Sequence, residues 1–338
     1  MPLISVVMPT YNTSVSFLKE AVDSILNQTF QDFEFIIIDD GSINDTPEYL
    51  RSLTDSRVRV IRNNENIGIT KSLNIGFNKA EGKYIARMDS DDISKLDRFE
   101  KQYLFMENNP DVIVCGSRVA NEKCLLSEYD ESFIPKIVED DMEIYRIHML
   151  FSNPGPFHST AFFRRDKLVC HSIKYDERLV YAQDYGMWMK VSQYGRICIL
   201  QEPLLYFRHH ENQISKIHRE EQIRCDKITQ KKLLYQLVES LTEKELDIHY
   251  RYSTRYYHDV IMTDEVKDWY LKLIKANNRK GIYNKSKFNR YVYQIMYHNI
   301  NLTWNNDMTK YEKLRILFRY MPWLEAFRTL IVTGKNNN

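Results

Sequence analysis

Four short stretches of the chain carry polar residues whose types and spacing suit chemistry, and the densest is Asp89-Ser90-Asp91-Asp92. Three carboxylates in four residues repel one another unless a cation or a hydrogen-bond donor neutralises them. Oxygen ligands of this kind suit the hard divalent cations Mg²⁺ and Mn²⁺. A solvated acidic loop that caps the following helix, with Asp92 in the cap, accounts for the same residues. From this tetrapeptide alone, the metal site and the capping loop both stay open.

Two further stretches, Asp39-Asp40-Gly41-Ser42 and Pro9-Thr10-Tyr11-Asn12, also follow apolar runs. An acid at a strand end can accept hydrogen bonds from a base N–H or a ribose hydroxyl, and the glycine permits a tight turn. An ordinary Asp-Gly turn with local capping explains the acidic stretch equally well. The tyrosine of the other stretch can stack on a nucleobase, although tyrosine is frequent in this chain, with 23 residues.

The fourth group centres on Asp184, which precedes the apolar residues Met187, Trp188 and Val191. Their spacing suits the buried face of a helix. Asp184 then lies at the helix N-terminus, where the macrodipole favours the ionised carboxylate. A plain helix cap is the alternative interpretation.

The elements that must position these groups alternate along the first 110 residues. Helix-periodic segments are predicted at 15–26, 46–53 and 70–80, and a further helix ends near Asn108, with Ser94 as its N-cap. Apolar runs of strand length lie at 3–8, 33–38, 58–61 and 83–88. This alternation predicts an α/β fold with a mostly parallel sheet and right-handed crossovers. Ligands of such sheets bind beyond the carboxyl ends of the strands, where the polar stretches fall.

Composition narrows the classes of protein. A formal net charge of +1 argues against a dedicated nucleic-acid binder, and 43% hydrophobic residues argue against disorder. No apolar run approaches the roughly 20 residues that span a bilayer, and no signal peptide is visible, so we expect a cytoplasmic protein. The odd cysteine count without a C-x-x-C pair predicts buried reduced thiols rather than disulfides or zinc. These cysteines are Cys115, Cys124, Cys170, Cys198 and Cys225.

In their order and spacing, the four groups together resemble family 2 of the GT-A glycosyltransferases. The resemblance covers about residues 3–215 and leaves a helix-rich C-terminal region outside it. It implies a GT-A catalytic domain at 1–214, with a nucleotide-binding half at 1–110 and an acceptor-binding half at 111–214, followed by a helical region at 215–338. The matching stretches are Ser5–Asn12, Ser24–Thr29, Ile38–Ser42, Asn66–Gly68, Leu73-Asn74, Gly82–Asp92, Phe157–Thr160, Phe163–Arg165, Gln183–Tyr185, Tyr206–His210 and Gln213–Ser215.

The resemblance also implies roles for single residues. Asp40 would bind the uracil of a UDP-sugar and Tyr11 would stack on it. Asp89 and Asp91 would form the DxD motif, with Asp91 in particular binding the divalent cation, Mn²⁺ or Mg²⁺, on the diphosphate. The further nucleotide-binding residues it implies are Pro9, Thr10, Asn12, Arg87 and Ser90.

On the acceptor side, the resemblance makes Asp184 the general base of an inverting transfer to a glycan or lipid-linked oligosaccharide. Many relatives carry glutamate at the place of Gln183, so a second carboxylate of the catalytic pair is missing here. His158 and Trp188 are candidates for acceptor binding. His209 and His210 are candidates for contacts with the diphosphate or the metal, and an incidental histidine pair is equally possible. Arg87 before the DxD motif resembles enzymes of bacterial surface polysaccharides and lipooligosaccharides.

The sequence lacks the features typical of two rival enzyme classes. A sugar-nucleotide nucleotidyltransferase normally opens with a glycine-rich basic loop, which the segment 5–12 lacks, and no G-x-G-x-x-G marks a dinucleotide enzyme. A non-catalytic sugar-nucleotide-binding scaffold would not need both the metal acids and Asp184. Residues 309–338 form a basic amphipathic segment that suits peripheral contact with the inner face of the membrane or packing on the catalytic domain.

Overall fold

The computed structural model describes residues 1–120, 141–210, 213, 217–253, 262–302 and 308–322. The chain divides into two compact units. The first comprises Met1–Ser127 and Gly155–Cys225, and the second comprises Glu128–Pro154 and Asp226–Asn338. Each unit therefore takes chain from two separate stretches, whereas the sequence suggested a single boundary near 214.

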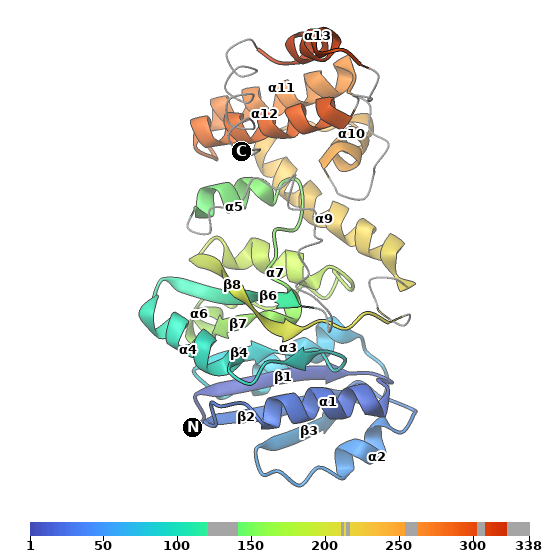
Figure 1. The fold of residues 1–338 in the computed structure, drawn as a ribbon, viewed down its shortest axis with the longest axis vertical. Coiled ribbons are helices and arrows are strands. Elements are labelled where there is room, and N and C mark those ends of the chain that lie inside the picture. Colours follow the sequence, from blue (N-terminus) through green and yellow to red (C-terminus); the bar gives the residue numbers. More distant parts are fainter. Residues whose placement is uncertain (121–140, 211–212, 214–216, 254–261, 303–307, 323–338) are drawn as a thin grey trace. The chain divides into compact units, whose positions relative to one another are not determined.

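The first unit is built on a mixed sheet, which in the described residues has eight strands in the order β3-β2-β1-β4-β7-β6-β8-β5 (Figure 1). β1 (Ile4–Thr10), β2 (Phe33–Asp39), β3 (Val58–Arg62) and β4 (Tyr84–Arg87) run parallel to one another. β7 (Phe162–Arg164) runs antiparallel between β4 and β6 (Val112–Ala120). β8 (Arg196–Tyr206) is parallel to β6, and the short β5 (Ile93–Ser94) pairs antiparallel with β8.

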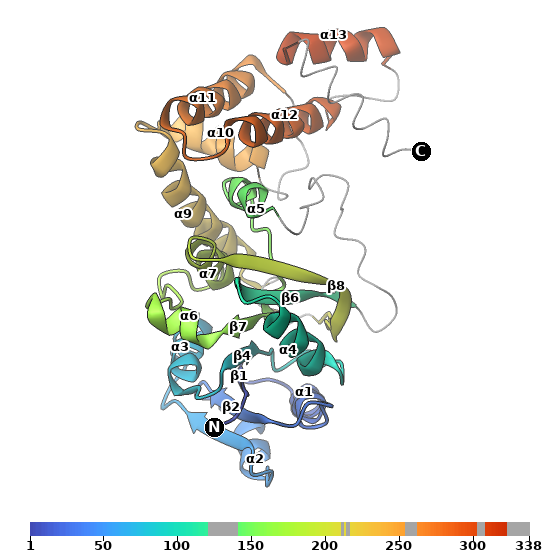
Figure 2. The same ribbon diagram turned by 90° about the vertical axis from the view of Figure 1, so that its left-hand side faces the viewer.

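Helices cover the sheet, so its central strands are apolar on both faces. The predicted alternation is confirmed by α1 (Val15–Leu26), α2 (Thr46–Arg51) and α3 (Ile69–Lys79), and Figure 2 shows α1 and α3 beside the strands. α3 approaches β1 closely at Gly76, where an added Cβ would lie 2.4 Å from Cγ1 of Val7. An added Cβ would overlap Val7, so glycine at this position allows α3 to pack directly against β1.

Two details differ from the sequence-based prediction. α4 (Arg98–Asn108) begins only after Asp97, and Ser94 is not its N-cap. Ser94 belongs to β5, and its N–H donates to Oγ of Ser24 on α1 at 3.1 Å, so tertiary pairing overrides the local capping signal. The prediction that all cysteines are buried was also wrong, because Cys170 at the end of α6 (Arg165–Cys170) is exposed; Cys124 lies outside the described residues.

The second unit is helical, which confirms the predicted helical C-terminal region. Among the described residues, no helix is both long and apolar enough to cross a membrane. Leu317 on the last helix is fully buried, and Arg319 pairs with Asp264 at 2.9 Å, so the described part of the basic amphipathic segment packs within this unit. Residues 323–338 of that segment lie outside the described residues. The described helices of this unit are α5 (Met142–His148), α10 (Glu243–Ser253), α11 (Asp264–Lys280), α12 (Lys285–Leu302), α13 (Lys310–Tyr320) and, from Asp226 onward, α9 (Arg219–Leu237).

A buried histidine ties the second unit together. His249 on α10 is 1% exposed; its Nε2 donates to the carbonyl oxygen of Leu150 at 2.8 Å, and its Nδ1 accepts from the indole N–H of Trp269 at 3.2 Å. One neutral tautomer satisfies both bonds, whereas a proton on Nδ1 would face the indole N–H. Burial lowers the pKa of His249 to about 4, and the bond to Leu150 opposes the shift.

Acid should therefore destabilise the second unit. Unfolded His249 binds a proton below its usual pKa of 6.5 while the folded side chain does not, so stability falls as the pH drops from 6.5 towards 4. The loss by pH 5 is at most about 2 kcal/mol. Urea unfolding followed by circular dichroism at pH 7 and pH 5 measures it. His249→Gln keeps a hydrogen-bond donor and an acceptor but cannot titrate, so it should lose less stability between pH 7 and pH 5. An equal loss of stability in the wild type and the variant would contradict the assignment.

Candidate active site

The acidic loop after β4 brings three carboxylates together. Asp89, Asp91 and Asp92 each offer one oxygen, and these atoms all lie within 4.8 Å of one another. Asp92 is buried, whereas Asp89 and Asp91 are partly exposed. The sequence pattern of alternating aspartates thus becomes a compact oxygen cluster with two members open to solvent.

Each acid of the cluster also has a protein partner. Arg87 forms an ion pair with Asp89. Nε2 of His210 contacts Oδ2 of Asp91 at 2.9 Å. The backbone N–H of Arg208 donates to Oδ1 of Asp92 at 3.2 Å. The residues Arg208 and His210, which follow β8, therefore lie against the loop that follows β4.

The three carboxylates of the cluster repel one another when they are ionised. Burial, and then the neighbouring carboxylates Asp89 and Asp91, raise the pKa of Asp92 well above its usual value. Burial also raises the pKa of Asp89 against the opposing effect of Arg87. A divalent cation would relieve this repulsion, and an all-oxygen set with one imidazole nearby is a donor set that Mg²⁺ or Mn²⁺ accepts. The residues present therefore fit a divalent metal.

Hydrogen bonds join this loop to the end of β1. Oγ1 of Thr10 donates to Oγ1 of Thr13 at 3.0 Å, and Thr13 shares a hydrogen bond with Oγ of Ser90 at 2.7 Å. The backbone N–H of Asn12 donates to Oγ of Ser42 at 2.9 Å, which joins β1 to the loop after β2. The three polar stretches predicted from separate strands thus lie side by side at one edge of the sheet.

Asp40 is nearly fully buried and holds the turn that follows β3. Its Oδ1 accepts from Nδ2 of Asn63 at 2.7 Å and from the N–H of Ile67 at 3.0 Å. Its Oδ2 accepts from the N–H of Gly68 at 2.9 Å. Oδ2 thus receives one bond and has capacity for a second. Next to it, Gly41 has φ +74°, and an added Cβ would lie 2.5 Å from the backbone of Glu65.

Asp184 lies in the first turn of α7 (Gln183–Val191), as the sequence predicted. The charge of Asp184 affects the pKa of Tyr175. Burial raises this pKa, the charges of Asp184 and Asp89 raise it further, and the charge of Arg87 opposes the shift. The charges of Asp184 and Asp89 thus both act on the Tyr175 hydroxyl.

The two acceptor candidates have different positions. His158, in the short turn η1 (His158–Thr160), contacts the Tyr175 hydroxyl through Nε2 at 2.8 Å, and burial and then Arg87 hold its pKa well below the usual value. Trp188 is fully buried and stacks on Phe163, with ring centroids 5.9 Å apart. Because it is fully buried, Trp188 exposes no surface to an acceptor in this structure.

A buried arginine–glutamine pair next to the acidic loop was not predicted from the sequence. Arg98 and Gln102 on α4 are both fully buried, and Nε of Arg98 donates to Oε1 of Gln102 at 2.9 Å. Nη2 of Arg98 donates to the carbonyl oxygen of Arg87 at 2.7 Å, and Nε2 of Gln102 donates to that of Thr160 at 2.8 Å. The pair thus joins the end of β4 to η1. An arginine on the apolar face of the helix after the acidic loop was the available signal.

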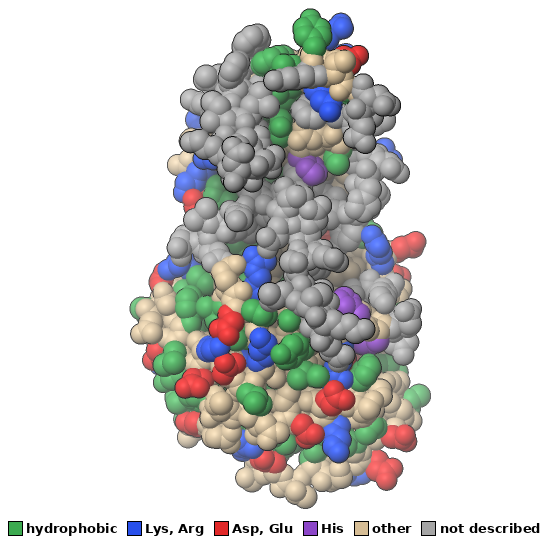
Figure 3. Space-filling model, viewed as in Figure 1, with side chains coloured by type: hydrophobic (Ala, Val, Ile, Leu, Met, Phe, Trp, Pro, Cys, Tyr) green, Lys and Arg blue, Asp and Glu red, His purple; other side chains and the backbone are tan. Residues whose placement is uncertain are grey.

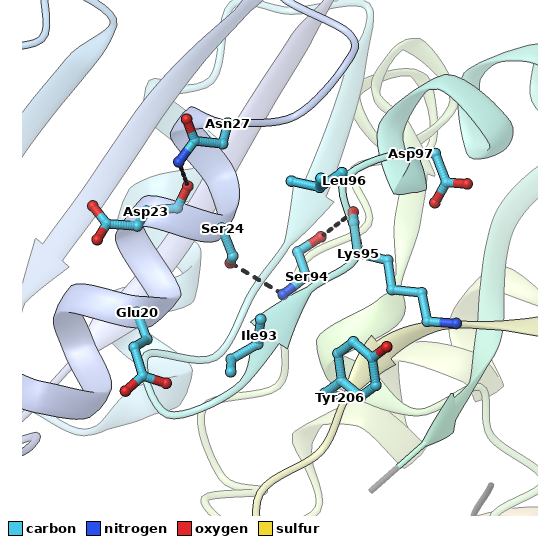
Figure 4. Close-up of a pocket in the computed structure, with 10 residues that line it drawn as sticks. All are labelled: Glu20, Asp23, Ser24, Asn27, Ile93, Ser94, Lys95, Leu96, Asp97 and Tyr206. Carbon is cyan, nitrogen blue, oxygen red and sulfur yellow. Dashed lines mark hydrogen bonds between the residues drawn. The ribbon is translucent and has the colours of Figure 1, made fainter. Parts of the chain in front are cut away.

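A separate surface pocket of about 650 Å³ lies between α1, the segment from Ile93 to Asp97, and Tyr206 (Figure 4). Its rim carries Glu20, and the ammonium of Lys95 lies 5.4 Å from the centre of the Tyr206 ring. None of the three clustered aspartates lines it, so this pocket is distinct from the acidic cluster. On the face drawn in Figure 3, side chains of both charges are interspersed over the first unit, in keeping with the small net charge.

Solved structures share this architecture. The S. aureus protein TarS in complex with UDP-GlcNAc has a TM-score of 0.57 at 18% identity, covering 91% of this chain and 94% of that one. The Pyrobaculum calidifontis mannosyltransferase PcManGT in complex with GDP-Man and Mn²⁺ has a TM-score of 0.51 at 15% identity, covering 99% and 80%. The fold is that of the GT-A glycosyltransferases, as predicted.

Sequence relatives give the family. Residues 5–171 match glycosyl transferase family 2. An uncharacterized glycosyltransferase of Haemophilus influenzae is 35% identical over 231 residues, which cover 65% of this chain and 70% of that protein. The amylovoran biosynthesis glycosyltransferase AmsE of Erwinia amylovora is 26% identical, covering 63% and 79%. The chain belongs to glycosyl transferase family 2 and is a glycosyltransferase, which removes the nucleotidyltransferase and scaffold alternatives.

Proposed function

We propose that this enzyme transfers a sugar from a UDP-sugar to a hydroxyl of a glycan or lipid-linked oligosaccharide, with inversion at the anomeric carbon and with the help of Mn²⁺ or Mg²⁺. One observation carries the proposal. The cluster of Asp89, Asp91 and Asp92, with oxygens within 4.8 Å of one another, follows β4 and is joined by hydrogen bonds through the end of β1 to the loop after β2, which carries Asp40.

The donor would bind along the three joined loops. Tyr11, 44% exposed at the end of β1, offers a ring for stacking on the base. The second acceptor position of Asp40 Oδ2 suits the N–H of uracil. The remaining donor contacts would come from Pro9, Thr10, Asn12, Arg87 and Ser90, several of which are already fixed by the hydrogen bonds between these loops.

A divalent cation would be held by Asp91 and Asp89, with His210 beside Asp91. When bound, the cation would supply electrostatic stabilisation of the charge that builds on the departing diphosphate. The chain itself would keep the acids in place through Arg98, Gln102 and the backbone N–H of Arg208.

Asp184 would act as the general base. It would accept the proton of the acceptor hydroxyl while that oxygen attacks the anomeric carbon from the face opposite the leaving UDP. An α-linked donor then gives a β-linked product. With Gln183 in place of the glutamate of many relatives, Asp184 would carry this step without a neighbouring second carboxylate.

The proposed acceptor rests on the relatives, and the proposed cellular location rests on the sequence. AmsE is named for amylovoran biosynthesis, which supports a role in polysaccharide synthesis. A cytoplasmic location with peripheral membrane contact through 309–338 stays a prediction. His158 contacts Tyr175, on which the charge of Asp184 acts, and it remains the candidate for shaping the acceptor site.

A donor panel tests the proposal. TarS was solved with UDP-GlcNAc and PcManGT with GDP-Man, so the panel should contain UDP-glucose, UDP-galactose, UDP-GlcNAc, UDP-GalNAc and GDP-mannose, each with lipid-linked acceptors. We expect UDP release from at least one UDP-sugar, its loss with EDTA and its return with Mn²⁺. Mass spectrometry identifies the product. Turnover with GDP-mannose alone would refute the uracil assignment, and turnover that survives EDTA would refute the role of the metal.

A further inference from the structure

The guanidinium of Arg87 is nearly buried, and one of its hydrogen-bond donors has no partner among the described residues. It ends β4, its side chain is 3% exposed, and both terminal nitrogens of its guanidinium contact the carboxylate of Asp89. Its Nε is buried and has no hydrogen-bond partner among the described residues. A buried guanidinium usually has its donors satisfied, because an unmet buried donor costs free energy.

The backbone of Arg87 is held from two sides. Its N–H donates to the carbonyl oxygen of Ala161 at 2.9 Å, and its own carbonyl oxygen accepts from Nη2 of Arg98 at 2.7 Å. Movement at this position is therefore confined to the side chain. The guanidinium contacts Asp89 of the acidic loop, and its charge lowers the pKa values of His158 and Tyr175.

Charge gives this side chain opposite effects on the two ligands of the site. A cation that arrives at Asp89 meets a positive guanidinium on its own ligand, so Arg87 opposes the binding of free metal. A diphosphate that arrives with the metal meets the same guanidinium as an attractive partner, which favours bidentate contact with phosphate oxygens. The positive charge of Arg87 therefore weakens the binding of free metal and strengthens the binding of the diphosphate.

We propose that Arg87 is the resident cation of the metal-free site: it holds Asp89 until metal and diphosphate arrive together, and it thereby makes their binding cooperative. The inference rests on the proposed function, since it takes Asp89 and Asp91 as the metal ligands. Cooperativity of binding is reciprocal, so UDP strengthens Mn²⁺ binding by the factor by which Mn²⁺ strengthens UDP binding.

The test measures Mn²⁺ affinity by calorimetry, without acceptor or turnover, in the absence and the presence of UDP. Arg87→Met should bind Mn²⁺ alone at least about fivefold more tightly than the wild type, because the competing charge is gone. The same variant should show a smaller gain in Mn²⁺ affinity on adding UDP. Work at pH 8 limits competition from protons on the carboxylates.

Two controls separate charge from structure. Arg87→Lys keeps the positive charge but loses the bidentate contact, so its affinity for Mn²⁺ alone should lie closer to that of the wild type than the affinity of Arg87→Met does. Lys83→Met removes a cation from just before β4, where Lys83 pairs with Glu107 at 2.5 Å, and should change neither affinity. Thermal unfolding checks that each variant is folded, and Arg87→Gln replaces Arg87→Met should the latter not fold.

The outcomes distinguish this inference from the function beneath it. Wild-type enzyme that binds no Mn²⁺ even with UDP overturns both the metal assignment and the role of Arg87. Wild-type enzyme that binds Mn²⁺ with UDP, beside a folded Arg87→Met variant whose affinity for Mn²⁺ alone is unchanged or weaker, overturns the inference and leaves the proposed function standing.

Discussion

Asp184→Asn should lower kcat by about 10² to 10⁴-fold, the usual contribution of a positioned general base. Asparagine has the shape of aspartate and can keep its place in the first turn of α7, but it cannot take the proton of the acceptor hydroxyl. In the proposed function the donor binds to the loops after β1, β2 and β4, away from Asp184, so the affinity for UDP should stay within about twofold. Steady-state rates with the preferred donor, together with calorimetry of UDP binding, measure both quantities.

A matched control for this variant is Asp166→Asn. Asp166 also lies in the first turn of a helix, α6, and it is exposed to solvent. It carries the same change of charge in the same kind of helical setting, so its turnover should equal that of the wild type. Near-normal kcat in Asp184→Asn would rule out Asp184 as the base, and a parallel loss of UDP affinity would indicate a role in the donor site instead.

The second large effect is expected from Asp91→Asn. An amide oxygen carries no full negative charge, so the cation would lose its strongest attraction at the most exposed acid of the cluster. We expect a fall in kcat/KM of at least about 100-fold and a higher Mn²⁺ concentration for half-maximal activity. Titration of activity with Mn²⁺ after EDTA treatment measures the change.

The control acid for this experiment is Asp97, which lies outside the cluster and pairs with Lys101 at 2.6 Å on the surface. Asp97→Asn should leave the response to Mn²⁺ unchanged. Equal Mn²⁺ dependence in the wild type and Asp91→Asn would exclude Asp91 as a metal ligand, whatever the effect on the overall rate.

Local sequence patterns were enough to predict the first half of the fold. The segment that became α1 has a clear period of 3.6 residues, and the segments that became β1 and β2 are nearly continuous apolar runs, as strands covered on both faces need. The order of strands and helices then forced the polar stretches at Thr10, Asp40 and Asp89 to one edge of the sheet. The place of Asp184 in the first turn of α7 followed from the apolar residues after it.

The less regular middle of the chain was not predictable in this way. β7 contributes three residues in an antiparallel position between β4 and β6, and β5 contributes two beside β8. Segments this short have no readable period, because their pairing partners come from distant parts of the chain. The false N-cap at Ser94 has the same origin, since its backbone N–H is taken by Ser24 on α1.

The sequence by itself determined which chemistry this protein can carry: an acidic loop after a buried strand, an acid beside an apolar strand end, and an acid at the start of a helix. Only the tertiary structure decided how these charges are balanced, through Arg87 on Asp89 and His210 on Asp91, and that Trp188 is core. His210 follows Asp91 by 119 positions, so no local pattern links them. Partners so far apart are chosen by the packing of the whole sheet, where burial makes an unpaired charge costly.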